Sequence, residues 1–207
     1  MTKSSFLSED EARKKRELLV GAGIGAALLL GLVTTLSLTG SSPVLPPSRS
    51  PAQKRKSPAE RLLALARSKV GQEYILGANV PKSDPTWAGP WDCAEFASWL
   101  VYQTTGRLVG VEDASANPAT AGTWTGLWAQ ASAKGAQGLR RVSVAEAIAT
   151  PGAFLLRIPQ QGAYGHIAIS DGHGGTVEAM NSDRNVTTSR SAGRDWDAGI
   201  LVNGIHS

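Results

Sequence analysis

The only cysteine of the chain, Cys93, lies in the segment GPWDCAEFASWL at residues 89–100. Asp92 before it is a good helix N-cap, and Glu95 follows Asp92 at the spacing of a capping box. We therefore expect a helix that begins at Cys93 and stops at Gly106. The unpaired N–H groups and the macrodipole at a helix start favour an anion, so the sequence predicts a lowered pKa for this thiol and a nucleophilic role.

A cysteine nucleophile needs a base, usually histidine, and a third group that orients the base. Of the three histidines, His166 opens an apolar strand-like segment and is the best base. Glu178 lies twelve residues later, across a turn expected near residues 172–175, where its carboxylate could accept the Nδ1–H of His166. His173 as a catalytic partner and Asn181 as the orienting group are the alternatives. Such scattered histidines and one cysteine predict no metal site, and no cofactor is expected.

The elements expected around these residues are helices first and short strands afterwards. A capping box at Ser57–Glu60, with a proline at the first helical position, begins a helix over residues 58–70. Residues 107–141 are polar with room for one short helix, and another short helix stops before Pro151. Alternating apolar segments then predict strands at 153–158, 166–170, 176–180 and 200–203. Helices followed by an antiparallel meander indicate an α+β fold.

The N-terminal part of the chain has the pattern of a membrane anchor. Residues 18–39 carry no charge and would span about 33 Å as a helix, enough for the hydrocarbon core. Residues 1–17 are basic just before this span, which favours a cytoplasmic N-terminus and an extracytoplasmic remainder. The linker at 40–57 is rich in Pro, Ser and Lys, and the globular domain is expected at 58–207.

Two other readings of the apolar span remain open. A cleaved signal peptide would usually have a shorter apolar core and a small-residue cleavage site. The many Gly, Ala, Ser and Thr residues make the span only moderately hydrophobic, so a segment that later leaves the membrane is the other alternative.

The positive charge is concentrated in the same N-terminal part. Residues 1–57 hold nine Lys and Arg against four Asp and Glu, whereas residues 58–207 hold twelve against thirteen. The globular part is therefore almost neutral, and we expect no nucleic-acid-binding surface on it.

Four segments in order, GQEYILGANV, PWDCAEFASWLVYQTTG, ATPGAFLLRIP and GHIAISDGHGGTVEAM, resemble the blocks of the NlpC/P60 family. These are papain-like cysteine peptidases of bacterial cell walls. The resemblance covers about residues 59–204 and implies a papain-like α+β domain. It also implies Cys93 as nucleophile, His166 as base and Glu178 in the orienting position, which is usually His, Asn or Gln in the family. Tyr74 would help to line the oxyanion site, and Asp92 would help to bind the free amine of a peptide stem.

Several positions depart from the family pattern. The family's Asp-Cys-Ser-Gly is Asp92-Cys93-Ala94-Glu95 here, and its Pro-Gly-Asp block ends in Ala153. The resemblance implies an endopeptidase acting on peptidoglycan stem peptides, and the apolar span at 18–39 adds the expectation that it is membrane-anchored. The alternatives are an N-acetylmuramoyl-L-alanine amidase or phage-type lysin on the same scaffold, and a catalytically degenerate module that binds the wall or a structural partner. For single residues, Cys93, His166, Tyr74, Asp92 and Glu178 each also allow a purely structural role.

Overall fold

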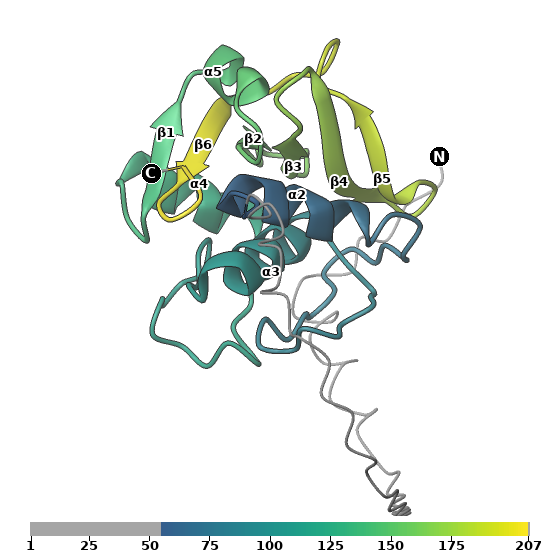
Figure 1. Ribbon diagram of the computed structural model, residues 1–207, viewed down its shortest axis with the longest axis vertical. Helices are drawn as coiled ribbons and strands as arrows, with labels where there is room; N and C mark the ends of the chain where they lie inside the picture. The colour runs from purple at the N-terminus through teal and green to yellow at the C-terminus, as the bar shows by residue number, and fades with distance from the viewer. Residues whose placement is uncertain (1–54, 207) are drawn as a thin grey trace, which may run out of the picture. The chain divides into compact units, whose positions relative to one another are not determined.

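The computed structural model describes residues 55–206 of the 207-residue chain. Helices dominate the first part of this region and strands the second part, as Figure 1 shows. The elements are, in order, α2 (Pro58–Arg67), α3 (Cys93–Thr105), α4 (Thr125–Ala133), β1 (Leu139–Val142), α5 (Val144–Ala149), β2 (Phe154–Arg157), β3 (His166–Ser170), β4 (Gly175–Asn181), β5 (Asn185–Arg190) and β6 (Ala198–Val202).

The local signals at the two long helices act as the sequence predicts. The Ser57 hydroxyl accepts from the Glu60 N–H at 3.2 Å, while the Glu60 carboxylate accepts from the Ser57 N–H at 2.6 Å. Helix α3 begins at Cys93 and ends at Gly106, whose φ of 71° lies in the left-handed region that glycine adopts without strain. Helix α2 is shorter than expected, because the chain turns after Arg67.

The six strands form one antiparallel sheet in the order β1-β6-β2-β3-β4-β5. Strands β2 to β5 follow one another as the predicted meander does, but β6 returns to lie between β1 and β2. The pairing of β3 with β4 is confined to one end, where Ile169 lies opposite Val177 and Ser170 opposite Thr176. No pairing with β4 is formed at His166 or Ile167, so the two strands separate at the start of β3.

Two hydrophobic clusters lie on opposite faces of this sheet, since alternate strand residues point to opposite sides. Helices α2, α3 and α4 cover one face, and α5 covers the other, as Figure 1 also shows. In the larger cluster Trp91 packs edge-on against Phe96 and Trp99, with ring centroids 5.2 and 5.0 Å apart. Burying each such side chain contributes roughly 1.5–3 kcal/mol, so this cluster holds α3 firmly against the sheet.

Strands β1 and β5 are not predicted by the sequence pattern. Both are edge strands, and their exposed positions carry polar residues rather than a continuous apolar run. Strand β5 begins at Asn185, a residue type that is depleted in strands. Edge strands have only one neighbouring strand and need little apolar surface, so a hydrophobic pattern does not reveal them.

The predicted N-terminal segments at 1–17 and 18–39, and nearly all of the linker at 40–57, lie outside the described residues. Between residues 55 and 206, no helix combines the length and the apolar character needed to cross a membrane.

Candidate active site

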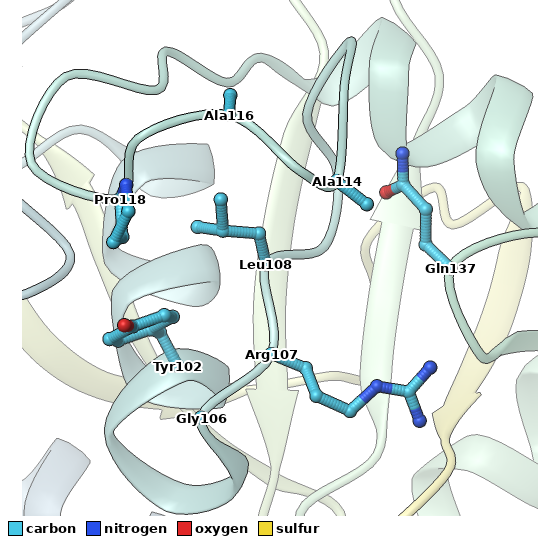
Figure 2. A pocket seen from close by; sticks show the side chains of 8 residues that line it. All are labelled: Tyr102, Gly106, Arg107, Leu108, Ala114, Ala116, Pro118 and Gln137. Carbon is cyan, nitrogen blue, oxygen red and sulfur yellow. The ribbon is translucent and has the colours of Figure 1, made fainter.

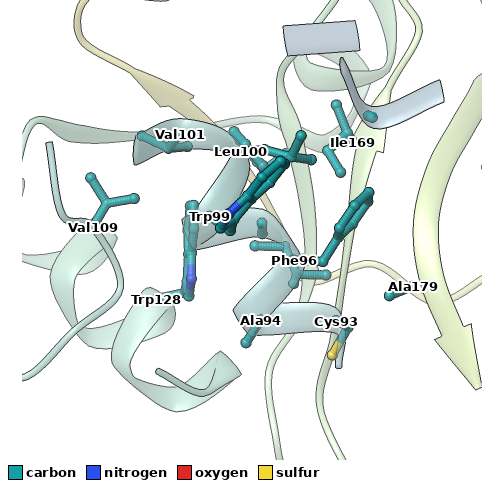
Figure 3. Close-up of a cluster of buried hydrophobic side chains, with 14 of the residues drawn as sticks. Cys93, Ala94, Phe96, Trp99, Leu100, Val101, Val109, Trp128, Ile169 and Ala179 are labelled. Atoms are coloured by element: carbon teal, nitrogen blue, oxygen red, sulfur yellow. The ribbon is translucent and has the colours of Figure 1, made fainter. Parts of the chain in front are cut away.

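Cys93 lies where α3 meets the separated ends of β3 and β4. Asp92 caps the helix, because its Oδ1 accepts from the Glu95 N–H at 2.8 Å, and this places Cys93 at the first helical position. The backbone of Ile167 lies near enough to the Cys93 thiol to lower its pKa. Figure 3 shows this sulfur pointing away from the aromatic cluster around Trp99. The thiol therefore lies beside the residue that follows His166.

The resting thiol is not the thiolate that the sequence predicts. Burial and the nearby Asp92 carboxylate raise the pKa of Cys93 to about 12. The N–H groups of Ile167, Ala94 and Cys93 itself lower this pKa, as expected at a helix start, but they do not outweigh burial of a side chain that is only 7% exposed. The prediction of a lowered thiol pKa is therefore wrong. Cys93 has to give up its proton to a base during any reaction.

His166 and Glu178 lie in contact, as the hairpin spacing predicts. The Nε2 atom of His166 is 2.5 Å from Oε2 of Glu178, and both side chains are buried. The predicted use of Nδ1 in this contact is wrong, because the ring presents Nε2 to the carboxylate. An ionised carboxylate can only accept, so Nε2 carries a proton, and Nδ1 is the ring nitrogen that does not face the carboxylate.

The Glu178 carboxylate is fully buried and has three partners. Besides His166, it accepts from the Thr176 hydroxyl at 2.5 Å and from both terminal nitrogens of Arg194, at 2.6 and 2.8 Å. Burial alone would raise the pKa of Glu178, but the hydrogen bonds from His166 and Arg194 outweigh it and lower the pKa to about 2. Glu178 is therefore ionised at any physiological pH.

Tyr74 reaches the same region from the loop after α2. Its segment runs beside Trp91: the Ile75 N–H donates to the Trp91 carbonyl at 2.8 Å, and Tyr74 forms an isolated parallel bridge with Trp91. Burial, followed by the nearby Cys93 and Asp92, raises the pKa of Tyr74. The phenol stays protonated and can act as a hydrogen-bond donor beside the thiol.

Asp92 is 7% exposed and does more than cap α3. Burial raises its pKa to about 7, although the N–H groups of Glu95 and Gly77 act in the opposite direction. A carboxyl group with this pKa changes charge near neutrality. Its ionised form would be favoured by a cationic ligand.

The side chain of Glu95 does not complete a capping box with Asp92. It is buried and pairs with the buried ammonium of Lys82, which also donates to the Ala121 carbonyl at 2.5 Å. Glu95 further accepts from the N–H groups of Val80, at 3.1 Å, and Thr123, at 3.0 Å. Glu95, which stands where the family has glycine, thus ties two loops to α3. Its charge is paired with Lys82 and does not face the thiol.

A pocket of about 330 Å³ lies at the other end of α3, as Figure 2 shows. Tyr102 follows Cys93 by nine residues, which is about 13 Å along a helix. The pocket therefore belongs to a region separate from the thiol and contains none of the predicted site residues. Its lining consists of Tyr102, Gly106, Arg107, Leu108, Ala114, Ala116, Pro118 and Gln137.

Of the predicted site residues, the structure brings His166 and Glu178 into contact and gathers Tyr74, Asp92 and Cys93 at the start of α3. The alternative partner His173 is exposed in the turn after β3. Across residues 55–206, no group of three or more His, Cys, Asp or Glu side chains could hold a metal ion.

Sequence reasoning missed three residues around Glu178, namely Thr176, Arg194 and Trp196. The Trp196 ring lies 6.0 Å from the His166 ring and 4.5 Å from the guanidinium carbon of Arg194. One signal could have led to Arg194. A carboxylate buried beside a histidine needs a second cation, so a basic residue in a neighbouring loop was to be expected.

Comparison with known proteins yields structural neighbours but no sequence family. No protein-family model matches the chain, and no curated protein matches it. The NlpC/p60 domain of the peptidoglycan hydrolase SagA is 24% identical, with a TM-score of 0.49 over 70% of this chain and 98% of that domain. The peptidoglycan hydrolase RipB from Mycobacterium tuberculosis is 18% identical, with a TM-score of 0.48 over 72% of this chain and 66% of RipB. NlpC1 from Trichomonas vaginalis is 17% identical, with a TM-score of 0.49 over 72% of this chain and 45% of that one.

The chain is similar in fold to NlpC/P60 domains. Since the identities lie below 25% and the TM-scores below 0.5, its chemistry has to be inferred from the residues of the site.

Proposed function

We propose that this chain is a cysteine peptidase that hydrolyses an amide bond in the peptide stems of peptidoglycan. The observation that carries the proposal is the contact between His166 and Glu178 at the start of β3, where the backbone of the next residue, Ile167, lies beside the Cys93 thiol. A thiol, an imidazole and an ionised carboxylate are the three groups of a cysteine-peptidase triad. The substrate class comes from the resemblance of the sequence blocks to NlpC/P60 peptidases.

The reaction begins with a protonated thiol, because the pKa of Cys93 is raised. Nδ1 of His166 takes the Cys93 proton as the sulfur attacks the amide carbonyl carbon, and Glu178 stabilises the imidazolium. The backbone N–H of Cys93 and the Tyr74 hydroxyl donate to the oxyanion. The C–N bond then breaks, the imidazolium protonates the leaving amine and a thioester remains. Water deprotonated by His166 hydrolyses the thioester, which releases the carboxylic acid and restores the thiol.

Residues 18–39 anchor the protein in the cell membrane in this proposal, with residues 1–17 in the cytoplasm and the catalytic domain outside. The tether confines hydrolysis to wall close to the membrane. Such a location suits local remodelling of peptidoglycan.

The first test is incubation of the full chain, kept in detergent, with purified peptidoglycan, followed by mass spectrometry of the soluble products. We expect fragments from the wild type and a loss of at least 1,000-fold in Cys93→Ala and His166→Ala, because Cys93 is the only thiol of the chain and His166 is the base that removes its proton. Hydrolysis retained in Cys93→Ala would exclude the mechanism.

The product masses also separate the alternatives. Cleavage between two amino acids of the stem identifies an endopeptidase, whereas release of muramic acid from L-alanine identifies an amidase. Binding of peptidoglycan without any fragment, unaffected by alkylation of Cys93, would instead identify a binding module.

A further inference from the structure

The loop between β5 and β6 contributes two side chains to the His166–Glu178 pair. Arg194 forms a two-pronged ion pair with Glu178, and its side chain is 24% exposed. Trp196 lies against both Arg194 and His166. Each oxygen of Glu178 thus accepts two hydrogen bonds: Oε1 from Thr176 and Arg194, and Oε2 from His166 and Arg194. The carboxylate has no free acceptor position and cannot rotate away from the imidazole.

The loop that carries Arg194 is itself fixed at both ends. At the start, Ser191 donates through its N–H and its hydroxyl to the Gly174 carbonyl, each at 3.0 Å. The Trp196 indole N–H donates back to the Ser191 carbonyl at 3.1 Å. At the other end, the backbone N–H of Asp197 donates to the Leu156 carbonyl at 2.8 Å. These bonds hold the guanidinium in one place over the carboxylate.

The charges at this place explain why an arginine is needed. The orienting residue in the family that this sequence resembles is usually neutral, whereas Glu178 is a buried anion. A lone buried carboxylate beside His166 would hold a proton on the imidazole too strongly for it to act as a base. The guanidinium of Arg194 cancels this charge, so the Glu178–Arg194 pair is neutral overall while Oε2 still accepts from Nε2.

We propose that Arg194 is a positioning residue, which makes Glu178 act toward His166 as a fixed, charge-compensated acceptor. The inference rests on the proposed function of His166 as the catalytic base. The charged or titratable groups that contact Glu178 are His166 from β3 and Arg194 from the loop. The loop's two acidic residues, Asp195 and Asp197, are exposed, and Asp197 accepts from the Ile158 N–H.

The test compares Arg194→Gln, Glu178→Gln and the double variant in the full chain, with Arg190→Gln as a matched control. Arg190 lies on the neighbouring strand β5 and is exposed, so its loss removes the same charge from the same sheet. We expect Arg194→Gln to lower kcat by 10- to 100-fold with KM changed less than threefold, because in this proposal Arg194 acts on His166 through Glu178. The acid limb of its kcat/KM profile should move up by about one pH unit.

The double variant distinguishes charge compensation from simple packing. Glu178→Gln leaves Arg194 facing an amide group without a compensating charge, whereas the double variant places a neutral acceptor beside His166 and removes the cation. We therefore expect the double variant to be at least tenfold more active than Glu178→Gln alone. A double variant as weak as, or weaker than, Glu178→Gln would overturn the proposal, as would an unchanged pH profile in Arg194→Gln.

A second measurement needs no substrate. Imidazole NMR follows the pH at which His166 gains its second proton, and we expect this midpoint to rise in Arg194→Gln and to stay unchanged in Arg190→Gln. An unchanged midpoint in a folded Arg194→Gln variant would overturn the positioning role. If the wild type hydrolyses no peptidoglycan, the proposed function fails, but the NMR titration still decides whether Arg194 controls His166.

Discussion

Asp92 affects the stability of the folded state in two opposing ways: it caps α3, and its buried carboxyl group is costly to ionise. As an N-cap it stabilises α3 through its bond to the Glu95 N–H. As a buried carboxyl group with a pKa of about 7, it disfavours its own ionisation. The folded state therefore binds one more proton than the unfolded state between pH ~4 and pH ~7, and stability falls as the pH rises through this window.

Replacing Asp92 with Asn should remove this loss of stability. Asparagine caps a helix about as well as aspartate but cannot ionise. We expect equal stability of both proteins near pH 4, and an advantage of up to about 4 kcal/mol for Asp92→Asn near pH 8. Urea denaturation at a series of pH values measures this difference. The same downward slope in Asp92→Asn would show that another group is responsible.

Glu178 titrates at lower pH than Asp92, so it does not affect the comparison of Asp92→Asn with the wild type between about pH 4 and about pH 8. Its folded pKa of about 2 lies below the ordinary value, so it stabilises the folded state above pH ~4.5. This contribution disappears as the pH falls toward 2.

At the scale of elements, the Lys82–Glu95 pair connects α3 to two loops whose only regular pairing is isolated β-bridges among the described residues. Glu95 receives N–H groups from Val80 and Thr123, and Lys82 reaches the Ala121 carbonyl. These bonds satisfy the buried backbone of both loops, so the loops depend on the pair for their conformation.

We expect Glu95→Gln to destabilise the domain by about 3–5 kcal/mol, because it leaves the ammonium of Lys82 buried without a counter-charge. Urea denaturation measures the loss. The double variant Lys82→Met/Glu95→Leu removes both charges and should recover at least half of it. A Glu95→Gln variant as stable as the wild type would show that the pair does not hold these loops.

At the scale of the whole molecule, we propose that a basic N-terminus and the span at 18–39 hold a nearly neutral catalytic domain at the membrane. Leu29 lies near the middle of the predicted span at 18–39, where an arginine is most costly. We expect the full chain to stay with membranes after a carbonate wash and Leu29→Arg to be recovered mostly in the supernatant. The Leu7→Arg variant, with its change outside the span, is the control. Equal partitioning of wild type and Leu29→Arg would contradict a membrane anchor.

The sequence by itself determined the order of the helices and of strands β2, β3, β4 and β6, together with the chemistry-bearing positions on them, but not the edge strands β1 and β5. Capping signals at Ser57 and Asp92, and a glycine at position 106, are local and act within one helical turn. Strand β3 was predicted with its observed bounds, because its apolar residues are continuous between turn residues. That His166 and Glu178 lie close together was also predictable, since a short turn joins their two strands, although the β3–β4 ladder does not extend to His166.

Only the tertiary structure decided the charge state and orientation of the site. The raised pKa of Cys93 follows from burial by residues distant in the sequence, which a helix-start argument does not include. The choice of Nε2 over Nδ1 depends on how the His166 ring packs, and the ion pair at Glu178 depends on Arg194, sixteen residues further along the chain. Burial and long-range pairing are properties of the packed molecule, because they depend on which segments meet once the chain has folded.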